Sequence, residues 1–269
     1  MITHRVRRSR ARLAVDAQRL RELYEASEIL RVVNVWDAVS AKVVSELPGT
    51  TAIATAGHGI AASHGYPDGE QIPLELMISA LERIVRATDL PVTADLDGGF
   101  EDSGETVRQA IEVGICGANI EDRLRPLGES VEIMRAALAA GEEEGIPFVL
   151  NARTDALLKG GDRAREASIA DAIERGRAYL EVGAQCVFVP GVVTAAEARE
   201  LVAGIGERKV SLIGLPGALS AAEYEALGVA RISYGPMPQN VALTALKRLG
   251  ESLYDDGVIP GDTEKLNNF

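Results

Sequence analysis

The stretch Pro91-Val92-Thr93-Ala94-Asp95-Leu96-Asp97-Gly98-Gly99 has the pattern of a short buried strand that ends in two carboxylates and then breaks at glycines. Residues two apart on a strand point to the same face, so we expect Asp95 and Asp97 to lie side by side. Neighbouring carboxylates repel each other unless a cation or a proton lies between them. Their oxygens suit a hard divalent ion such as Mg²⁺. The stretch therefore predicts a strand with a metal site at its carboxyl end.

Similar strand-like runs alternate with helical patterns along the chain. The mostly apolar runs of strand length are 32–36, 51–55, 92–96, 118–120, 148–152, 186–189, 210–214 and 231–234. The helical patterns are 40–47, 74–87, 104–113, 131–144, 167–182, 195–204, 221–227 and 241–249. Strands that are apolar on both faces belong to a parallel sheet covered by helices. Eight such units in 269 residues predict an α/β fold, a (β/α)₈ (TIM) barrel, with a doubly wound open sheet as the alternative.

Both ends of the chain carry segments outside this count. Residues 15–26 have an amphipathic pattern, which predicts an extra helix before the first strand. Residues 1–14 are rich in arginine, and we expect them to form a solvated, disordered basic tip. Residues 15–269 would then form a single barrel domain that includes a C-terminal arm from about residue 249.

The composition excludes several classes of function. With 28 Lys and Arg against 40 Asp and Glu, the formal net charge is -12, which argues against a nucleic-acid partner because phosphate backbones require clustered cations. No apolar run reaches the roughly 20 residues of a membrane span, and we see no signal-peptide pattern. The cysteines, Cys116 and Cys186, lie in strand-like positions that suit reduced thiols, so we expect a cytoplasmic protein.

In a barrel of this kind, the active site lies where the strands end. The residues that follow the first five predicted strands include Trp36, Asp37, Ala56, Gly57, His58, Asp95, Asp97, Glu121, Asp122, Arg153 and Asp155. The acids are concentrated after the third to fifth strands, and Arg153 lies among them. An acidic metal site beside a basic anchor suits a small-molecule substrate whose carboxylate binds both.

The order of these motifs resembles the isocitrate lyase and phosphoenolpyruvate mutase superfamily from about residue 33 to about residue 249. The matching stretches are Asn34 to Ala41 (NVWDAVSA), Gly65 to Gly69 (GYPDG), Ala94 to Gly99 (ADLDGG), Asn119 to Asp122 (NIED), Asn151 to Ala156 (NARTDA), Val187 to Gly191 (VFVPG) and Leu227 to Ser233 (LGVARIS). Each motif is weak alone, but together and in this order they form a specific pattern.

The resemblance implies a Mg²⁺-dependent enzyme, with Mn²⁺ as an alternative ion, that acts on a small α-oxo or α-hydroxy carboxylate through a pyruvate-type enolate. It implies that Asp95 binds the metal directly and that Asp97, Glu121 and Asp68 hold metal-bound water. It also implies that Arg153 holds the substrate carboxylate. The other residues that it places at the substrate are Trp36, Ala56, Gly57 and His58. Family members are homo-oligomers, so a tetramer or dimer that exchanges its last helix is expected.

One departure from the family pattern bears on the reaction. Lyases of the family carry a Lys-Lys-Cys-Gly-His type loop after the fourth strand, whereas this chain has Arg123-Leu124-Arg125-Pro126-Leu127-Gly128-Glu129. Without the loop Cys, the chain resembles a phosphonomutase-like branch. We expect C–C cleavage that needs no loop Cys, such as decarboxylation of an oxaloacetate-like acid or a retro-aldol. The alternatives are a phosphonomutase or phosphonate-cleaving enzyme, and a member that has lost catalysis and binds a ligand.

Several of these residues also have structural interpretations. Asp68 lies in a Pro-Asp-Gly sequence that is typical of a plain turn. Glu121 and Asp122 alternate on a strand, so only one can face the barrel interior, and the resemblance favours Glu121. Arg153 can pair with neighbouring acids to hold the barrel mouth together. His58 is a candidate proton donor or a polar filler of a glycine-rich segment.

Overall fold

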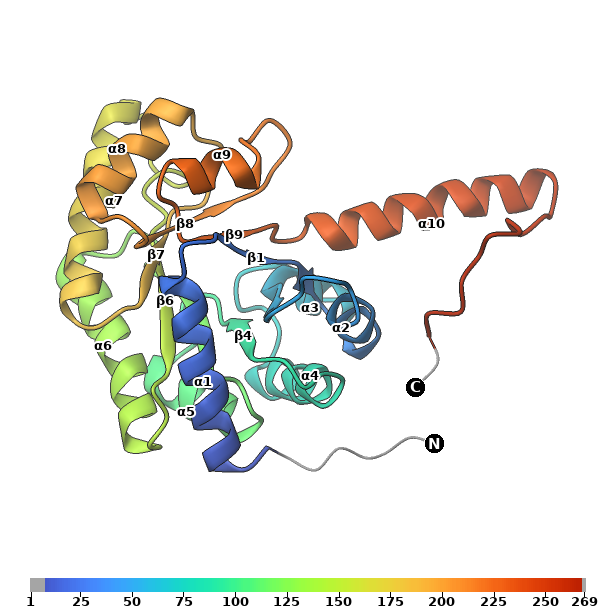
Figure 1. Cartoon of the computed structure of the whole chain (residues 1–269), viewed down its shortest axis with the longest axis horizontal. Helices are drawn as coiled ribbons and strands as arrows, with labels where there is room; N and C mark the ends of the chain where they lie inside the picture. The colour runs from blue at the N-terminus through green and yellow to red at the C-terminus, as the bar shows by residue number, and fades with distance from the viewer. Residues whose placement is uncertain (1–7, 268–269) are drawn as a thin grey trace.

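The structure, a computed structural model, describes residues 8–267. Its strands form a parallel sheet surrounded by helices (Figure 1). The strands are β1 (Leu30–Val32), β2 (Asn34–Val35), β3 (Ile53–Thr55), β4 (Val92–Asp95), β5 (Gly117–Glu121), β6 (Val149–Arg153), β7 (Cys186–Phe188), β8 (Val210–Ile213) and β9 (Arg231–Ser233). Their spatial order is β1-β9-β8-β7-β6-β5-β4-β3-β2.

The sheet closes into a ring through a first strand that has two parts. β1 pairs with β9, β2 pairs with β3, and Val33 alone separates the two parts. Each part satisfies the backbone groups of an edge that would otherwise be open. With β1 and β2 counted as one interrupted strand, this is the predicted eight-stranded parallel barrel, and the open-sheet alternative is wrong.

The helices lie mainly around the outside of this ring (Figure 1). They are α1 (Arg10–Glu25), α2 (Ala38–Ser45), α3 (Gly57–Ser63), α4 (Leu74–Arg86), α5 (Ser103–Glu112), α6 (Leu127–Glu143), α7 (Arg165–Glu181), α8 (Ala195–Ile205), α9 (Ala221–Ala226) and α10 (Met237–Asp255). Ala, Val, Leu and Ile dominate the buried core, as the low aromatic content predicts. Within residues 8–267, no helix is long and apolar enough to cross a membrane.

Helix α1 covers the amino-terminal end of the barrel. Its Leu20 lies so close to Gly117, the first residue of β5, that an added Cβ there would approach Leu20 Cδ2 to 2.9 Å. Tyr24, also fully buried, lies near the first residue of β9, Arg231. The carboxyl ends of the strands are therefore the open end of the barrel.

The start of α1 differs from the expected basic tip. The helix begins at Arg10, and Arg8 pairs with buried Asp16 at 2.8 Å. Arg8 also donates to the carbonyl of Leu90 at 2.8 Å, which ties the N-terminal segment to the start of β4. The expectation of disorder is therefore wrong for residues 8–14, because Arg8 and Arg12 bind buried Asp16, although residues 9–12 are exposed as expected. The residues before Arg8 lie outside the described part of the chain.

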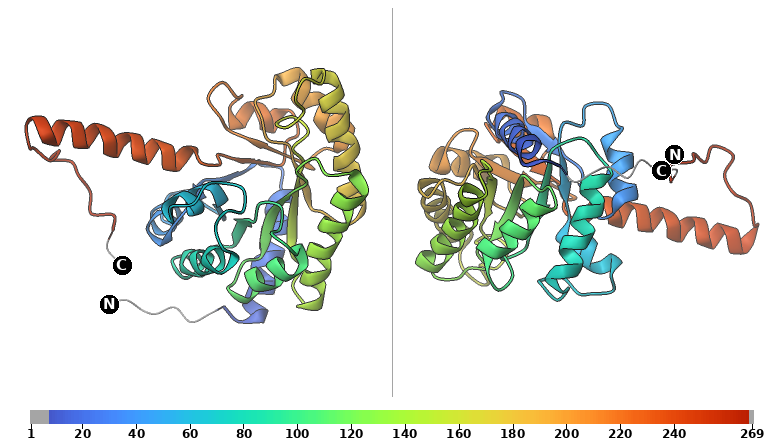
Figure 2. Two further views of the ribbon diagram at one scale, coloured as in Figure 1. Left: turned by 180° about the vertical axis from the view of Figure 1, so that it is seen from behind. Right: turned by 90° about the horizontal axis from the view of Figure 1, so that it is seen from below.

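Helix α10 leaves the barrel and extends away from it (Figures 1 and 2). Gln239 at its base is buried and donates to the carbonyl of Gly59 at 3.1 Å. Beyond this point Val241, Leu243 and Leu246 are more than half exposed. The helix is longer than its predicted span, because the sequence pattern of a helix with no partner in its own barrel is a weak guide to its ends.

Two local features at the barrel mouth differ from expectation. α3 begins at Gly57, directly after β3, where the sequence predicts a loop. β4 ends at Asp95, and Asp97 has a φ of 50°, so the expectation that both lie on one strand face is wrong. The cause is a tight turn, in which the Gly99 N–H donates to the Leu96 carbonyl at 2.9 Å.

Candidate active site

A cavity of about 340 Å³ opens at the carboxyl ends of the strands. Its polar and charged lining residues are Asn34, His58, Asp68, Asp95, Asp97, Asn119, Glu121, Arg153, Lys159 and Ser233. Its larger apolar lining residues are Leu158, Phe188, Pro190, Ile213 and Pro236. The cavity therefore brings together the acids and the arginine that the sequence separates by many residues.

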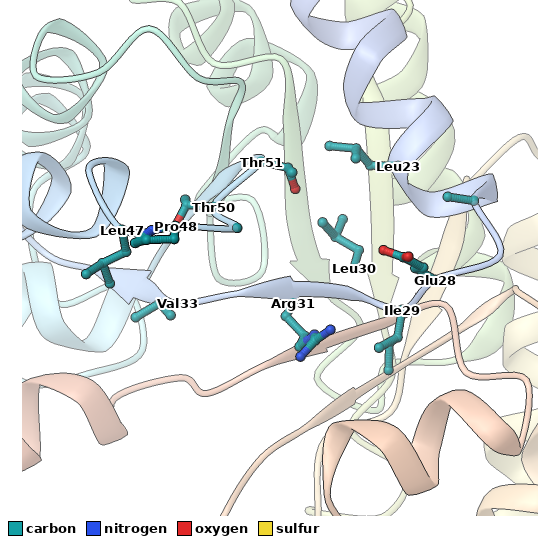
Figure 3. A pocket seen from close by; sticks show the side chains of 12 residues that line it. Leu23, Glu28, Ile29, Leu30, Arg31, Val33, Leu47, Pro48, Thr50 and Thr51 are labelled. Atoms are coloured by element: carbon teal, nitrogen blue, oxygen red, sulfur yellow. The ribbon is translucent and has the colours of Figure 1, made fainter.

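Another cavity, of about 410 Å³, lies at the opposite end of the barrel (Figure 3). The end of α1, β1 and the segment before β3 line it, with Leu23, Leu30 and Thr51 among the side chains in view. Glu28 and Arg31 are its charged lining residues, and it has no cluster of acids. We therefore place the candidate site in the cavity at the carboxyl ends.

Asp95 is held at the end of β4 by the neighbouring strand and helix. Its backbone N–H donates to the Thr55 hydroxyl at 3.0 Å, and the Gly57 N–H donates to its Oδ2 at 3.1 Å. Burial raises the pKa of Asp95, while the positive charge of Arg153 and the Gly57 N–H oppose this rise. Glycine permits this close approach, because a Cβ at position 57 would lie in tight contact, 3.3 Å, with the carboxylate.

Asp97 carries the clearest sign of crowded negative charge. Only 7% of the residue is exposed, and burial together with the charges of Asp95, Asp68 and Glu121 raises its pKa to about 8. Its position in the turn, and not on the strand, brings its carboxylate to the cavity. Without a compensating cation, Asp97 is therefore mainly protonated at neutral pH.

Two acids and two bases form a cluster of ion pairs at and after the ends of β5 and β6. Its members are Glu121, Arg153, Asp155 and Lys159. Arg153 donates to Glu121 Oε2 and to Asp155 Oδ1, each at 2.8 Å. Lys159 Nζ lies 2.5 Å from Asp155 Oδ2 and 3.6 Å from Glu121 Oε1. Although burial works against the charged guanidinium, the two carboxylates raise the pKa of Arg153, so it stays charged. Its guanidinium also lies 6.0 Å from the ring centre of Phe188.

Asp122 faces away from the cavity and has a structural role. Its Oδ2 accepts from the Tyr179 hydroxyl at 2.7 Å and from Arg175 at 3.2 Å. Its Oδ1 accepts from the Asp155 N–H at 3.0 Å. The prediction that only one of Glu121 and Asp122 faces the barrel interior, and that it is Glu121, agrees with this arrangement.

Glu70 holds the turn that carries Asp97, a role that the sequence did not indicate. Its Oε1 accepts from the backbone N–H groups of Gly98 and Phe100, both at 2.8 Å. Arg123 joins Glu70 at 2.9 Å to Glu121 at 3.1 Å. The segment after β5 thus connects the Asp97 turn to the end of β5 through Arg123.

The remaining predicted residues occupy different surroundings. His58 Nδ1 lies 3.4 Å from Asp68 Oδ2, and both side chains are about half exposed at the cavity mouth. Trp36 lies outside this cavity, in a separate, mainly apolar cleft next to Pro238. Ala56 is buried as the residue that precedes α3, and it does not line the cavity either.

The acids fit a divalent cation in chemistry but are not arranged around one. Carboxylate oxygens are the ligands that Mg²⁺ and Mn²⁺ prefer, and burial together with the neighbouring carboxylates raises the pKa of Asp97. In residues 8–267, however, no three His, Cys, Asp or Glu side chains stand together as a ready metal site. Arg153 and Arg123 bind Glu121 instead, which draws it into the ion-pair cluster.

Three polar residues that line the cavity were not predicted as site residues: Lys159, Asn34 and Asn119. Asn34 and Asn119 lie inside quoted family motifs, so their positions at strand ends were available as a signal. Lys159 lies in a segment without apolar periodicity, and only the fold turns it toward the cavity.

Comparisons with known proteins agree with this fold. Residues 20–254 match the family described as phosphoenolpyruvate phosphomutase. The 2,3-dimethylmalate lyase of Eubacterium barkeri is 30% identical over 271 residues, which cover 94% of this chain and 91% of the lyase. The structure of a provisionally named phosphonomutase from Burkholderia cenocepacia J2315 is 37% identical, with a TM-score of 0.82 and coverage of 91% of this chain and 100% of that one.

A third relative binds a small dicarboxylate. The structure of oxaloacetate acetylhydrolase with its product oxalate is 27% identical and has a TM-score of 0.82, with coverage of 93% of this chain and 91% of that one. The relatives thus include carbon–carbon lyases and hydrolases. From the extent of the family match and the identity to the dimethylmalate lyase, this chain belongs to the PEP mutase/isocitrate lyase superfamily.

Proposed function

We propose that the protein is a Mg²⁺-dependent carbon–carbon lyase that acts on a small α-oxo or α-hydroxy carboxylate through a pyruvate-type enolate. The observation that carries the proposal is the presence of a charged guanidinium, Arg153, in one cavity with Asp95, Asp97 and Glu121. Cations of the protein would bind the substrate carboxylate, and the acids would hold a divalent ion that offsets negative charge on oxygen.

The residues divide this work by their positions. Arg153 is fixed by two carboxylates and by Phe188, so it presents a rigid planar donor to the substrate carboxylate. Asp95, Asp97 and Glu121 would hold Mg²⁺ or Mn²⁺, directly or through water. When bound, such an ion supplies Lewis-acid stabilisation of negative charge on oxygen.

The segment after β5 supplies no proton donor of the Cys or His type. Arg123 is bound to Glu70 and Glu121, so this segment acts as a brace. His58, paired with Asp68 at the cavity mouth, is the group that we assign to proton transfer to the enolate carbon. Bond cleavage that releases CO₂ needs no enzymatic acid at the departing group, which suits this arrangement.

A product assay tests the proposal. The purified protein with Mg²⁺ is given oxaloacetate, 2,3-dimethylmalate or 2-methylisocitrate, and pyruvate is measured with a coupled dehydrogenase. We expect pyruvate from at least one acid at a rate well above that with Asp95→Ala protein, which also corrects for metal-catalysed decarboxylation in solution. If every acid gives the same rate with wild-type and Asp95→Ala protein, the lyase proposal is wrong.

The same assay distinguishes the two alternative functions, which are P–C bond chemistry and ligand binding without catalysis. The 37% identity to a provisionally named phosphonomutase supports phosphonopyruvate as an added substrate, with phosphate or phosphoenolpyruvate as the product to measure. Turnover of phosphonopyruvate alone would favour P–C chemistry. Tight binding of oxalate without turnover of any of these acids would favour a member that has lost catalysis.

We also propose that the protein is a homo-oligomer, a tetramer or dimer, in which α10 packs on another subunit. Exposed Val241, Leu243 and Leu246 on a helix that leaves its own barrel support this proposal. An apolar helix surface of this kind gains stability when a neighbouring subunit covers it.

A further inference from the structure

Lys159 is a charged residue of the cavity to which the proposed reaction gives no role. It lies in the segment after β6 and lines the same cavity as Arg153. Its Nζ lies 2.5 Å from Asp155 Oδ2, and Asp155 is fully buried, whereas 48% of the Lys159 side chain is exposed. The ammonium group is therefore held on one side and accessible to a ligand on the other.

Arg153 contacts the same two acids as Lys159, and these contacts occupy three of its five N–H donors. It reaches Glu121 through Nη1 and Asp155 through both Nε and Nη2, at 2.8 to 2.9 Å. The Lys159 ammonium has three N–H donors, and within residues 8–267 its contacts with Asp155 at 2.5 Å and Glu121 at 3.6 Å are ion pairs without hydrogen-bond geometry. Donors of Lys159 thus remain for a ligand.

The geometry points to Lys159 as the residue that binds the second carboxylate of a dicarboxylate substrate. This inference rests on the proposed function, in which Arg153 binds the first carboxylate. Arg153 and Lys159 bind opposite oxygens of Asp155, so their charged groups are separated by at most one carboxylate and two ion-pair contacts, roughly 8 Å. Two cations no farther apart than this can contact the two carboxylates of one four-carbon acid.

The other lining residues of the cavity also favour Lys159 as the binding site of the second carboxylate. Asp68 and Asp95 on the other side of the cavity provide no N–H donor for a second carboxylate. On the side of β6 and β7, the lining is Lys159 with apolar Leu158 and Phe188. Lys159 is thus the specificity-determining residue that favours dianions over monoanions.

Binding of a matched pair of acids tests this role without requiring turnover. L-malate and L-lactate are both α-hydroxy acids, and malate has one additional carboxylate. Titration calorimetry with Mg²⁺ present should show malate binding at least about tenfold more tightly than lactate to wild-type protein. Lys159→Met should remove most of this difference while it leaves the Kd of lactate unchanged within about twofold. Lys159→Arg should restore the preference for malate.

A control variant and kinetics complete the test. Arg163→Met is the control variant, because it removes a positive charge from the same segment. Arg163 pairs with Asp171 and does not line the cavity, so this variant should leave the Kd of malate and of lactate unchanged. If oxaloacetate is turned over, Lys159→Met should raise its KM and leave kcat within a few-fold. Equal weakening of malate and lactate, no effect on either, or an equal effect of Arg163→Met would overturn the inference.

The two proposals fail in different ways. Loss of the malate preference in Lys159→Met, together with no turnover by wild-type protein, would keep the carboxylate role and reject the lyase. Turnover of oxaloacetate with unchanged KM in Lys159→Met would keep the lyase and reject the role of Lys159.

Discussion

Asp97 is the residue whose charge depends most on a bound cation. Its pKa of about 8 in the folded protein exceeds the ordinary value of 3.8, so between these pH values the folded state binds a proton that the unfolded state releases. The free energy of unfolding of metal-free protein therefore falls as the pH rises from about 4 to about 8. The amide of Asp97→Asn cannot ionise, so the free energy of unfolding of this variant should depend less on pH in this range.

Thermal melting in a chelator between pH 5 and pH 9 measures this effect. At pH 8 we expect the free energy of unfolding of Asp97→Asn to exceed that of wild type by about 1–3 kcal/mol. This is less than the free energy that corresponds to the whole rise in the pKa of Asp97, because the acids can move apart. Glu251→Gln, an exposed carboxylate on α10, serves as the control and should melt as wild type does. Parallel melting curves of Asp97→Asn and wild type across this pH range would contradict the crowding of the acids.

Addition of the metal should reverse the same repulsion. Mg²⁺ competes with protons for the acids, so it should raise the melting temperature of wild-type protein more at pH 8 than at pH 6. Asp95→Ala should show little response to Mg²⁺ at either pH. An equal Mg²⁺ response of wild type and Asp95→Ala would place the cation elsewhere.

Arg153 should be sensitive even to a change that keeps its charge. Lysine cannot make the planar contacts with Glu121 and Asp155 at once, so Arg153→Lys should lower kcat/KM on the order of 100-fold. Circular dichroism should show an intact fold. Arg135→Lys is a matched control, because its ion pair with Glu132 is exposed on α6, and its activity should equal that of wild type.

At the scale of elements, the stability of the barrel should depend on the buried face of α1. Leu20 is fully buried against the first residue of β5, so Leu20→Ala should cost about 2–5 kcal/mol through a cavity at the barrel base. Val15 on the same helix is 64% exposed, and Val15→Ala should change stability by less than about 0.5 kcal/mol. Urea denaturation followed by far-UV circular dichroism compares the two, and equal costs would show that α1 does not close the barrel.

Strands were the most predictable elements and the segments next to glycines the least. A parallel barrel strand is buried on both faces, so runs such as residues 186–189 stand out as uninterrupted apolar sequence. α3 was missed because its sequence, Gly57-His58-Gly59-Ile60-Ala61-Ala62-Ser63, has two glycines and no apolar stripe, yet packing against its neighbours makes it helical.

The candidate site was predictable in composition but not in geometry. Strand ends identify Asp95, Glu121 and Arg153 because a barrel gathers them at one end. The turn that takes Asp97 off the strand depends on Glu70, a contact between segments 28 residues apart in sequence. Lys159 reaches Asp155 within its own segment, but it approaches Glu121 only when the fold brings β5 and β6 together.

At the scale of the whole molecule, α10 should determine the assembly state. Leu243 and Leu246 are 53% and 63% exposed, so they suit an interface with another subunit. Light scattering should give the mass of a dimer or tetramer for wild type and a smaller mass for Leu246→Glu. Thr244→Glu tests the neighbouring polar position on the same helix and should disturb assembly less, whereas a monomeric mass for wild type would end the proposal.

The pairing of β1 with β9 has a consequence for how the chain matures. It joins Leu30 to Arg231, so the circle cannot be completed until most of the polypeptide has left the ribosome. Until then, the early strands expose an open edge that can pair wrongly with other nascent chains. Slow expression at reduced temperature, or a plentiful supply of chaperones, should therefore improve the yield of this protein more than any change at the catalytic cavity.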